Sequence, residues 1–342
     1  MHTNASNVQN ITLLAIESSC DDTAAAVICN GKILSNIIAG QTVHEKYGGV
    51  VPELASRSHQ KNIVPVVDLA LKKAGISIKE IDGIAFTQGP GLLGSLLVGH
   101  SFAKGLALSL NKPLIAVNHL EAHVMAHLIE NPEMAFPFLC LLVSGGHTQI
   151  IKVNSPFHME ILGKTIDDAA GEAFDKAAKI LGLPYPGGPL IDKYATKGNP
   201  LAYKFPPGKI PELDFSFSGF KTSVLYFIRD KMAEDATFIE KNLSDICASV
   251  QHTIVTYLLS KLKKAAMQTG IKNIAISGGV AANSGLRKNL EIMAEMENWQ
   301  TFIPAFEYCT DNAAMIAIAG YYKFMADDTV GFDISPYASI KK

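Results

Sequence analysis

Residues Ile11–Cys29 read ITLLAIESSCDDTAAAVIC, two apolar runs that flank a turn of small polar residues. Short apolar runs bounded by turn residues are typical of buried β-strands. The polar turn Ser18–Thr23 is short, so it predicts an antiparallel hairpin between the two runs. Alternating strand-like and helix-like segments follow, which is the order of an α/β unit.

The segments after this hairpin complete one α/β lobe. Gly75 is expected to end the first helix, because glycine readily adopts the left-handed conformation found at helix C-termini. The expected elements are a strand at Lys32–Ile38, a helix at Pro52–Ala74, a strand at Gly83–Thr87, a helix at Leu92–Leu110 and a strand at Pro113–Asn118.

The same pattern then begins again with a second hairpin, whose turn is Gly145-Gly146-His147. We therefore expect an α/β fold of two lobes with a central cleft. The first lobe is expected at 1–118, completed by a C-terminal helix at about 311–330, and the second at 119–310 with a long loop at about 195–217. The expected elements are strands at Phe138–Ser144, Thr148–Val153 and Asn273–Gly279, and helices at Asp168–Leu181, Asp245–Thr269, Ala281–Met296 and Asp311–Ala326.

Composition excludes several classes of protein. The 342 residues are 48% hydrophobic and 18% charged, which is ordinary for a soluble globular chain. The net charge of −2 gives no overall basic field, so binding to nucleic acid requires a local patch or a partner. Five cysteines without a C-x-x-C pair favour a reducing cytosol over a disulfide framework or a zinc knot.

Two segments bear on membranes and export. The first ten residues are polar, so we expect no signal peptide there. The most apolar stretch, Leu92–Leu110, is interrupted by glycines, His100 and Lys104, and it predicts a buried helix better than a membrane span.

His119 and His123 occur in the string HLEAH, four residues apart on one predicted helix face. Two imidazoles at this spacing can bind one metal ion, and His127 extends the face. A partly buried polar face without metal explains the spacing equally well. Glu121 is misplaced for the H-E-x-x-H protease signature. Asp311 is either the third ligand or the N-cap of the last helix.

Two glycine turns, Ser144–His147 and Ser277–Gly279, follow apolar strands, and an acidic turn surrounds Asp21. Paired glycines let the backbone approach a ligand closely, and their N–H groups can bind phosphate. Together these turns indicate a nucleotide site, although each glycine pair alone is also an ordinary tight turn. The P-loop and G-x-G-x-x-G motifs are absent from the sequence.

Asp168, Glu172 and Asp175 are spaced so that they share one face of a predicted helix. Carboxylates on one helix face repel each other, so such a row destabilises the helix unless basic groups neutralise it or it serves a function. A solvated acidic face, compensated by Lys176 and Lys179, is the alternative to a functional role.

Taken together, ten motifs in this order closely resemble the TsaD family, the bacterial tRNA N6-adenosine threonylcarbamoyltransferases. The resemblance extends from about Ile11 to Ala326. The motifs are IESSCDDT (Ile16–Thr23), YGGVVPELASRSH (Tyr47–His59), GPGLLGSLLVG (Gly89–Gly99), NHLEAH (Asn118–His123), LLVSGGHTQ (Leu141–Gln149), DDAAGEAFDKAAK (Asp167–Lys179), YPGGP (Tyr185–Pro189), DFSFSGFKT (Asp214–Thr222), SGGVAAN (Ser277–Asn283) and CTDNAAMIA (Cys309–Ala317).

The resemblance implies the fold of actin, Hsp70-type chaperones and sugar kinases. It implies transfer of a threonylcarbamoyl group from threonylcarbamoyl-AMP to N6 of adenosine 37, in the anticodon loop of tRNAs that read codons beginning with adenine. It also implies a cytoplasmic enzyme that works with a TsaB-like paralogue and a TsaE-like ATPase. The helices Pro52–Ala74 and Leu92–Leu110 are the contact surfaces we expect for these partners.

The resemblance further implies one divalent metal, usually iron(II), on His119, His123 and Asp311, and the donor set is also compatible with zinc. We hypothesise that Asp175 or Glu172 accepts a proton or orients substrate. Substrate contacts are implied at Leu142, Val143, Ser144, Gly145, Gly146, Asp175, Gly188, Asp192 and Asn283.

Two other functions are weighed against this transferase. One is an ATP-dependent kinase or ATPase of the same superfold, and the other is a non-catalytic nucleotide-binding scaffold. A local basic patch for tRNA is expected in or beside the long loop, and its members are Lys193, Lys197, Lys204, Lys209 and Lys221.

Overall fold

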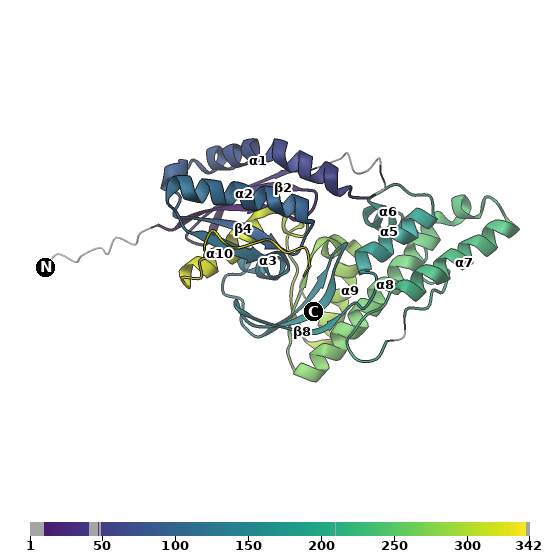
Figure 1. The fold of residues 1–342 in the computed structure, drawn as a ribbon. Coiled ribbons are helices and arrows are strands. Elements are labelled where there is room, and N and C mark those ends of the chain that lie inside the picture. The colour runs from purple at the N-terminus through teal and green to yellow at the C-terminus, as the bar shows by residue number, and fades with distance from the viewer. Residues whose placement is uncertain (1–9, 41–46, 48, 209, 340–342) are drawn as a thin grey trace. The chain divides into compact units, whose positions relative to one another are not determined.

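The structure is a computed structural model that describes residues 10–40, 47, 49–208 and 210–339 (Figure 1). Lys209 of the expected basic patch and most of the polar N-terminal segment lie outside the described residues. The chain divides into two compact units. Unit 1 comprises Met1–Gln41, Val50–Ile129 and Asp311–Lys342, and unit 2 comprises Thr42–Gly49 and Glu130–Thr310.

Unit 1 contains a five-stranded sheet in the order β3-β2-β1-β4-β5. The first three strands are antiparallel, and β4 and β5 continue the sheet parallel to β1. The strands are β1 (Thr12–Glu17), β2 (Thr23–Cys29), β3 (Lys32–Ala39), β4 (Gly83–Gly89) and β5 (Leu114–Asn118). The helices are α1 (Pro52–Ala74), α2 (Leu93–Leu110), α3 (His119–Met125), α4 (His127–Glu130) and α10 (Ala313–Met325), with a 3-10 turn at Ile78–Glu80.

Helices cover both faces of this sheet, because successive residues of a strand point to opposite sides. Ile84 and Phe86 of β4 pack in one core with α1 and α2. Ala85, which lies between them, faces α10, where a side-chain carbon added to Gly320 would be only 2.5 Å from the Ala85 Cβ. The last helix of the chain therefore closes the far face of the first sheet.

Unit 2 repeats this topology with the strand order β10-β9-β6-β7-β8. Its strands are β6 (Phe138–Val143), β7 (Thr148–Ser155), β8 (His158–Lys164), β9 (Asn273–Ser277) and β10 (Gln300–Phe302). Its helices are α5 (Ala170–Ile180), α6 (Gly187–Ala195), α7 (Ser218–Glu234), α8 (Phe238–Thr269) and α9 (Ser284–Glu297), with 3-10 turns at Gly279–Ala282 and Phe306–Tyr308.

The structure confirms both hairpins, and it contains elements that were not predicted from the sequence. The added elements are β8, β10, α6 and α7. The edge strand β8 is largely exposed and lacks a clean apolar alternation, and α6 begins with two glycines and a proline, so neither gives the usual signal. The segment His119–Ile129 belongs to unit 1, whereas the second lobe was expected to begin at residue 119.

The long loop between α6 and α7 has neither helix nor strand in its described residues. It is attached to α8 by Lys261, a buried lysine. The Lys261 Nζ donates hydrogen bonds to the carbonyl oxygens of Ile210 and Glu212, both at 2.7 Å. The loop therefore has a defined path over the core of unit 2.

Helix α2 differs from the expected buried helix. One face, including Leu96, Gly99 and Ala103, is buried against the sheet and α1, while Leu97 and Leu108 are exposed. By length and composition alone, α2 is the one described helix that is apolar enough to cross a membrane. The core helix of a soluble protein passes the same test, and α2 packs as an outer layer of unit 1.

Candidate functional site

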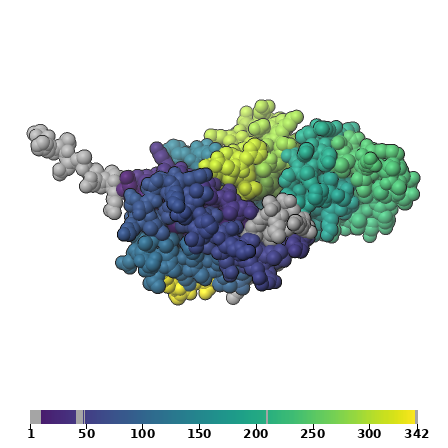
Figure 2. Space-filling view, turned by 90° about the horizontal axis from the view of Figure 1, so that it is seen from above, coloured from purple at the N-terminus to yellow at the C-terminus, as the bar shows by residue number. Residues whose placement is uncertain are grey.

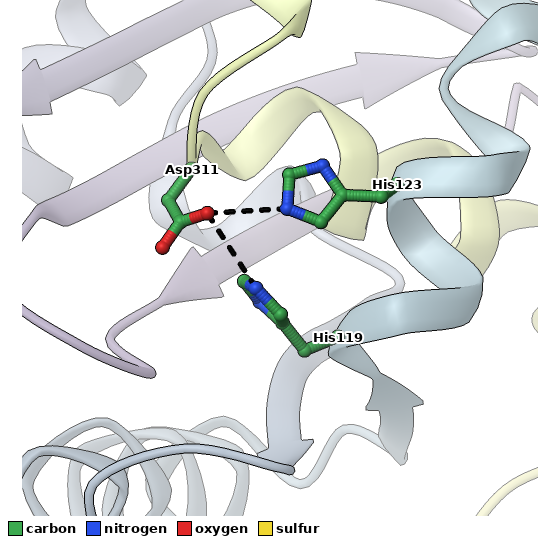
Figure 3. A group of neighbouring side chains, drawn as sticks. All are labelled: His119, His123 and Asp311. Carbon is green, nitrogen blue, oxygen red and sulfur yellow. Dashed lines mark hydrogen bonds and ion pairs between the residues drawn. The ribbon is translucent and has the colours of Figure 1, made fainter. Parts of the chain in front are cut away.

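Three side chains of unit 1 converge in the arrangement that HLEAH suggested (Figure 3). His119 and His123 lie one turn apart on α3, and both are buried. The Oδ1 atom of Asp311 lies 3.1 Å from Nε2 of His123 and 3.5 Å from Nε2 of His119. His127 begins the separate helix α4 and does not belong to this group, and Glu121 is exposed.

The N-caps of α3 and α10 are other residues, so the side chains of His119, His123 and Asp311 can face one another. Asn118 caps α3, since its Oδ1 accepts hydrogen bonds from the backbone N–H groups of Leu120 and Glu121. Asn312, and not Asp311, caps α10 by accepting from the N–H of Met315. The N-cap role considered for Asp311 is therefore wrong, and its carboxylate faces the two imidazoles.

Glu17 holds His119 from the other side. Its Oε2 lies 3.1 Å from Nδ1 of His119, and the Oγ of Ser19 lies 3.2 Å from the same nitrogen. Glu17 is fully buried at the end of β1, where it also accepts hydrogen bonds from the N–H of Ser19 and from the Oγ1 of Thr87 at 2.6 Å. A carboxylate on Nδ1 orients an imidazole so that the Nε2 lone pair faces a metal ion.

The pKa values of Glu17 and His119 depend on each other and on Asp311. Burial alone would raise the pKa of Glu17, but the adjacent His119 lowers it. Burial alone would lower the pKa of His119, but Asp311 and Glu17 together raise it to about 9. The pKa of Asp22 in the neighbouring acidic turn is raised to about 7 by burial and by the nearby carboxylates. The surroundings are electronegative and therefore favour a cation.

The donor set fits a divalent metal. Two imidazole nitrogens and one carboxylate oxygen lie within 4.8 Å of one another. Sites with two histidines and one carboxylate bind iron(II) or zinc and leave coordination positions open for a substrate or water. The carboxylate on Nδ1 of His119 supplies the outer contact that such sites usually have.

A second group of predicted residues lies in unit 2, around the two glycine turns. Leu142 and Val143 end β6, and the next turn is closed by the N–H of Ser144, which donates to the carbonyl of His147 at 2.8 Å. Gly145 and Gly146 are exposed. Gly278 packs against this turn, because a side-chain carbon there would be 2.4 Å from the Val143 carbonyl oxygen. Unit 2 therefore brings both glycine turns together.

The acidic residues of unit 2 serve different contacts. The Oδ1 of Asp175 accepts hydrogen bonds from the N–H groups of Gly187 and Gly188, at 2.8 and 3.1 Å. Burial raises the pKa of Asp175 and the two N–H donors oppose that shift. Lys176 pairs with both Asp168 and Glu172 at 2.7 Å. The three carboxylates that were expected to act together therefore have different partners. Asp175 binds the N-terminus of α6, and Asp168 and Glu172 bind Lys176.

Asn283 and Asp192 both support the N-terminus of α9. Asn283 caps it through the N–H of Leu286 and donates from Nδ2 to Oε1 of Gln251 at 2.7 Å. Asp192 accepts from the N–H and the hydroxyl of Ser284. Asp175, Gly188, Asp192 and Asn283 therefore fix the ends of two helices in unit 2.

Three further residues contribute to the site and were not predicted from the sequence: Glu17, Ser19 and Asn118. Two of them carry a recognisable signal. Glu17 is a charged residue at the end of an apolar strand, which requires a buried partner, and Asn118 is a good N-cap immediately before a histidine-bearing helix.

Comparisons with known proteins identify the family of the chain. A family model described as TsaD, tRNA N6-adenosine threonylcarbamoyltransferase, matches residues 32–318. A protein of that name from Christiangramia forsetii is 62% identical, over 97% of this chain and 99% of its own. One from Porphyromonas gingivalis is 59% identical over the same shares of the two chains.

Solved structures support the two-lobed fold. HypF from T. kodakarensis matches with a TM-score of 0.62 and 16% identity, over 93% of this chain and 48% of its own. The component A of (R)-2-hydroxyglutaryl-CoA dehydratase from Acidaminococcus fermentans matches with a TM-score of 0.54 and 16% identity, over 92% and 98%. These likenesses show an α/β fold of the actin and sugar-kinase type. With the family model and relatives of this identity, the chain belongs to the TsaD family, the tRNA N6-adenosine threonylcarbamoyltransferases.

Proposed function

We propose that the chain transfers a threonylcarbamoyl group from threonylcarbamoyl-AMP to N6 of adenosine 37, in tRNAs that read codons beginning with adenine. The observation that carries the proposal is a relative of this name that is 62% identical over nearly both full chains. The cluster of buried His119 and His123 with half-buried Asp311 within unit 1 supports the same chemistry. A kinase or scaffold function has no separate observation in its favour.

The reaction makes clear demands on the protein. The N6 amine attacks the carbamoyl carbon, a C–N bond forms, the C–O bond to phosphate breaks, and AMP leaves with the electron pair. N6 then gives up one proton. The amine is a weak nucleophile because its lone pair is delocalised into the ring, so the protein must stabilise the departing phosphate and orient the donor.

The two imidazoles and the carboxylate of unit 1 support the metal in this proposal. We assign it to His119, His123 and Asp311, with iron(II) as the ion and zinc as the alternative to be tested. A metal ion held there would supply Lewis-acid charge for the transfer. Glu17 orients His119 for this role through the 3.1 Å contact with Nδ1.

Unit 2 supplies candidates for donor binding. The exposed turn at Ser144, Gly145 and Gly146 follows Leu142 and Val143 and has room for a ligand close to the backbone. Asp175 is better suited to orienting substrate than to accepting a proton, because its carboxylate already holds the N–H groups of Gly187 and Gly188. Glu172 is the alternative proton acceptor, although it is paired with Lys176.

Partners complete the proposal. Exposed lysines at 193, 197 and 204 offer a local basic surface for the anticodon loop, whose bases are unpaired and can be splayed out.

A TsaB-like paralogue and a TsaE-like ATPase are the protein partners that we infer. We place the reaction in the cytoplasm, in line with five cysteines that are all free.

The test uses the purified chain with its partners, threonylcarbamoyl-AMP and unmodified tRNA, and detects the modified nucleoside by mass spectrometry. We expect product from the wild type, and we expect His119→Ala to lose product and bound metal together. His158→Ala, an exposed histidine of β8, is the matched control. Wild-type product from His119→Ala would contradict the metal role, and phosphoryl transfer to a small hydroxyl without tRNA would support a kinase instead.

A further inference from the structure

The end of the chain returns to unit 1 as a strap, which we define as residues Val330–Ala338. It begins beside β5, where the N–H of Val330 donates to the carbonyl of Leu114 at 2.9 Å. Val330 and Ile334 pack against the apolar core of unit 1. The family model matches only as far as residue 318, so the strap lies beyond the segment on which the family assignment rests.

Polar contacts attach the strap to α2 and to the end of β4. Lys104 Nζ donates to the Ile334 carbonyl at 2.7 Å, and Gln88 Nε2 donates to the Ser335 carbonyl at 3.0 Å. Gly89, with a φ of +153°, lies directly under Tyr337, where a side-chain carbon would be 2.2 Å from the Tyr337 carbonyl oxygen. Only glycine allows this approach, so the path of the strap is built into β4.

Tyr337 connects the strap to the helix that carries the two histidines. Its hydroxyl accepts a hydrogen bond from Nδ2 of Asn118 at 2.9 Å. The other end of the same carboxamide, Oδ1, caps α3 at the N–H groups of Leu120 and Glu121. Asn118 directly precedes His119, so one side chain links the strap to the first turn of the metal-binding helix.

We infer that Tyr337 is a positioning residue that fixes the Asn118 cap and, through it, the two imidazoles of α3. An asparagine bonded at both ends of its amide has one defined orientation, whereas one bonded only at Oδ1 is free to tilt. Outer residues that orient ligands commonly govern metal affinity. The inference rests on the metal assignment proposed above.

The experiment measures cobalt(II) binding to the full-length chain, by the d–d absorption of the bound ion and by competition with a chromophoric chelator. Tyr337→Phe removes one hydroxyl and keeps the ring over Gly89. We expect its affinity for cobalt(II) to fall by about threefold to tenfold, the range of one neutral hydrogen bond, with a shifted d–d spectrum. Tyr321→Phe is the control, because that ring packs against Gly31.

A double-mutant cycle separates positioning from general stability. Asn118→Ser keeps a good N-cap but is too short to reach Tyr337. We expect Asn118→Ser to weaken cobalt(II) binding, and we expect Tyr337→Phe to add nothing in that background. Equal losses from Tyr337→Phe in both backgrounds would overturn the inference, as would an unchanged affinity and spectrum in Tyr337→Phe.

The metal assignment is tested separately by His119→Ala. If this variant binds cobalt(II) like the wild type, the metal site itself is wrong. If His119→Ala loses binding while Tyr337→Phe keeps it, the metal site stands and the role of Tyr337 fails. A lower unfolding temperature of Tyr337→Phe with unchanged cobalt(II) affinity would assign the strap to stability alone.

Discussion

At the scale of single residues, the site depends on which of two neighbours caps a helix. Asp311 and Asn312 are both good N-cap residues, and their order alone does not decide which side chain turns back onto the helix. In the structure Asn312 caps α10, and Asp311 is left to face His119 and His123. Glu17 completes the cluster from a strand far away in the chain.

Asp167 provides a residue-scale prediction about pH. Its carboxylate accepts from the N–H of Phe217 and from the hydroxyls of Ser216 and Ser218. Burial opposes ionisation of Asp167, but these donors outweigh it and lower its pKa. Since the folded pKa lies below the unfolded value, the carboxylate stabilises the fold above about pH 4 and loses this effect as the pH falls through the folded pKa.

We therefore expect Asp167→Asn to lower the free energy of unfolding by on the order of 1 kcal/mol at pH 7, a value reduced for its exposure to solvent. Urea unfolding at pH 7 and near pH 3 measures the effect, and the difference from wild type should shrink at the lower pH. Asp230→Asn, which removes only an exposed pair with Arg229, is the control. If the loss in free energy of unfolding is the same at both pH values, the ionised carboxylate of Asp167 is not its cause.

At the scale of elements, glycines decide how closely helices of unit 2 approach. Gly187 at the start of α6 lies against α5, where an added side-chain carbon would be 2.2 Å from the Cβ of Ala178. The same residue donates its N–H to Asp175. Close packing and the hydrogen bond together hold the N-terminus of α6 beside a residue proposed to orient substrate.

Gly187→Ala is expected to destabilise the protein by about 1–3 kcal/mol, the usual cost of overpacking a core contact. Gly219→Ala in α7 is the matched control, because no heavy atom lies within 4 Å of the added carbon. The control should change stability by less than about 0.5 kcal/mol, because Gly219 lies in the first turn of α7, where helix propensity counts less than in the interior. Thermal unfolding compares the two variants, and equal behaviour would refute the packing argument.

At the scale of the whole molecule, each unit has its own apolar core and the same sheet topology. Unit 1 nevertheless leaves apolar side chains uncovered. The helix α1 lies on the face of unit 1 that Figure 2 shows, within the dark blue region. A groove of about 390 Å³ runs along it, lined by Val64, Val67 and Phe102 among others. We propose that this groove is a contact surface for the TsaB-like paralogue.

Val64, which is 60% exposed at this groove, tests the assignment of the surface to a TsaB-like paralogue. We expect Val64→Glu to weaken the complex by tenfold or more, since it buries a charge against apolar atoms. A binding isotherm with the purified paralogue measures the change. Met267→Glu on α8, an exposed apolar residue of unit 2, is the control. Equal affinity for Val64→Glu and wild type would place the partner elsewhere.

The sequence alone predicted the two hairpins, the helices α1 and α2 and the pairing of His119 with His123, because hydrophobic periodicity and helical spacing are local properties. Tertiary structure decided that Asp311 joins them, that Glu17 supports His119, and that Asp175 holds the start of α6 while Glu172 pairs with Lys176. It also decided that Tyr337 reaches the cap of α3. These contacts join residues distant in the chain, and only the packing of strands and helices brings their side chains together.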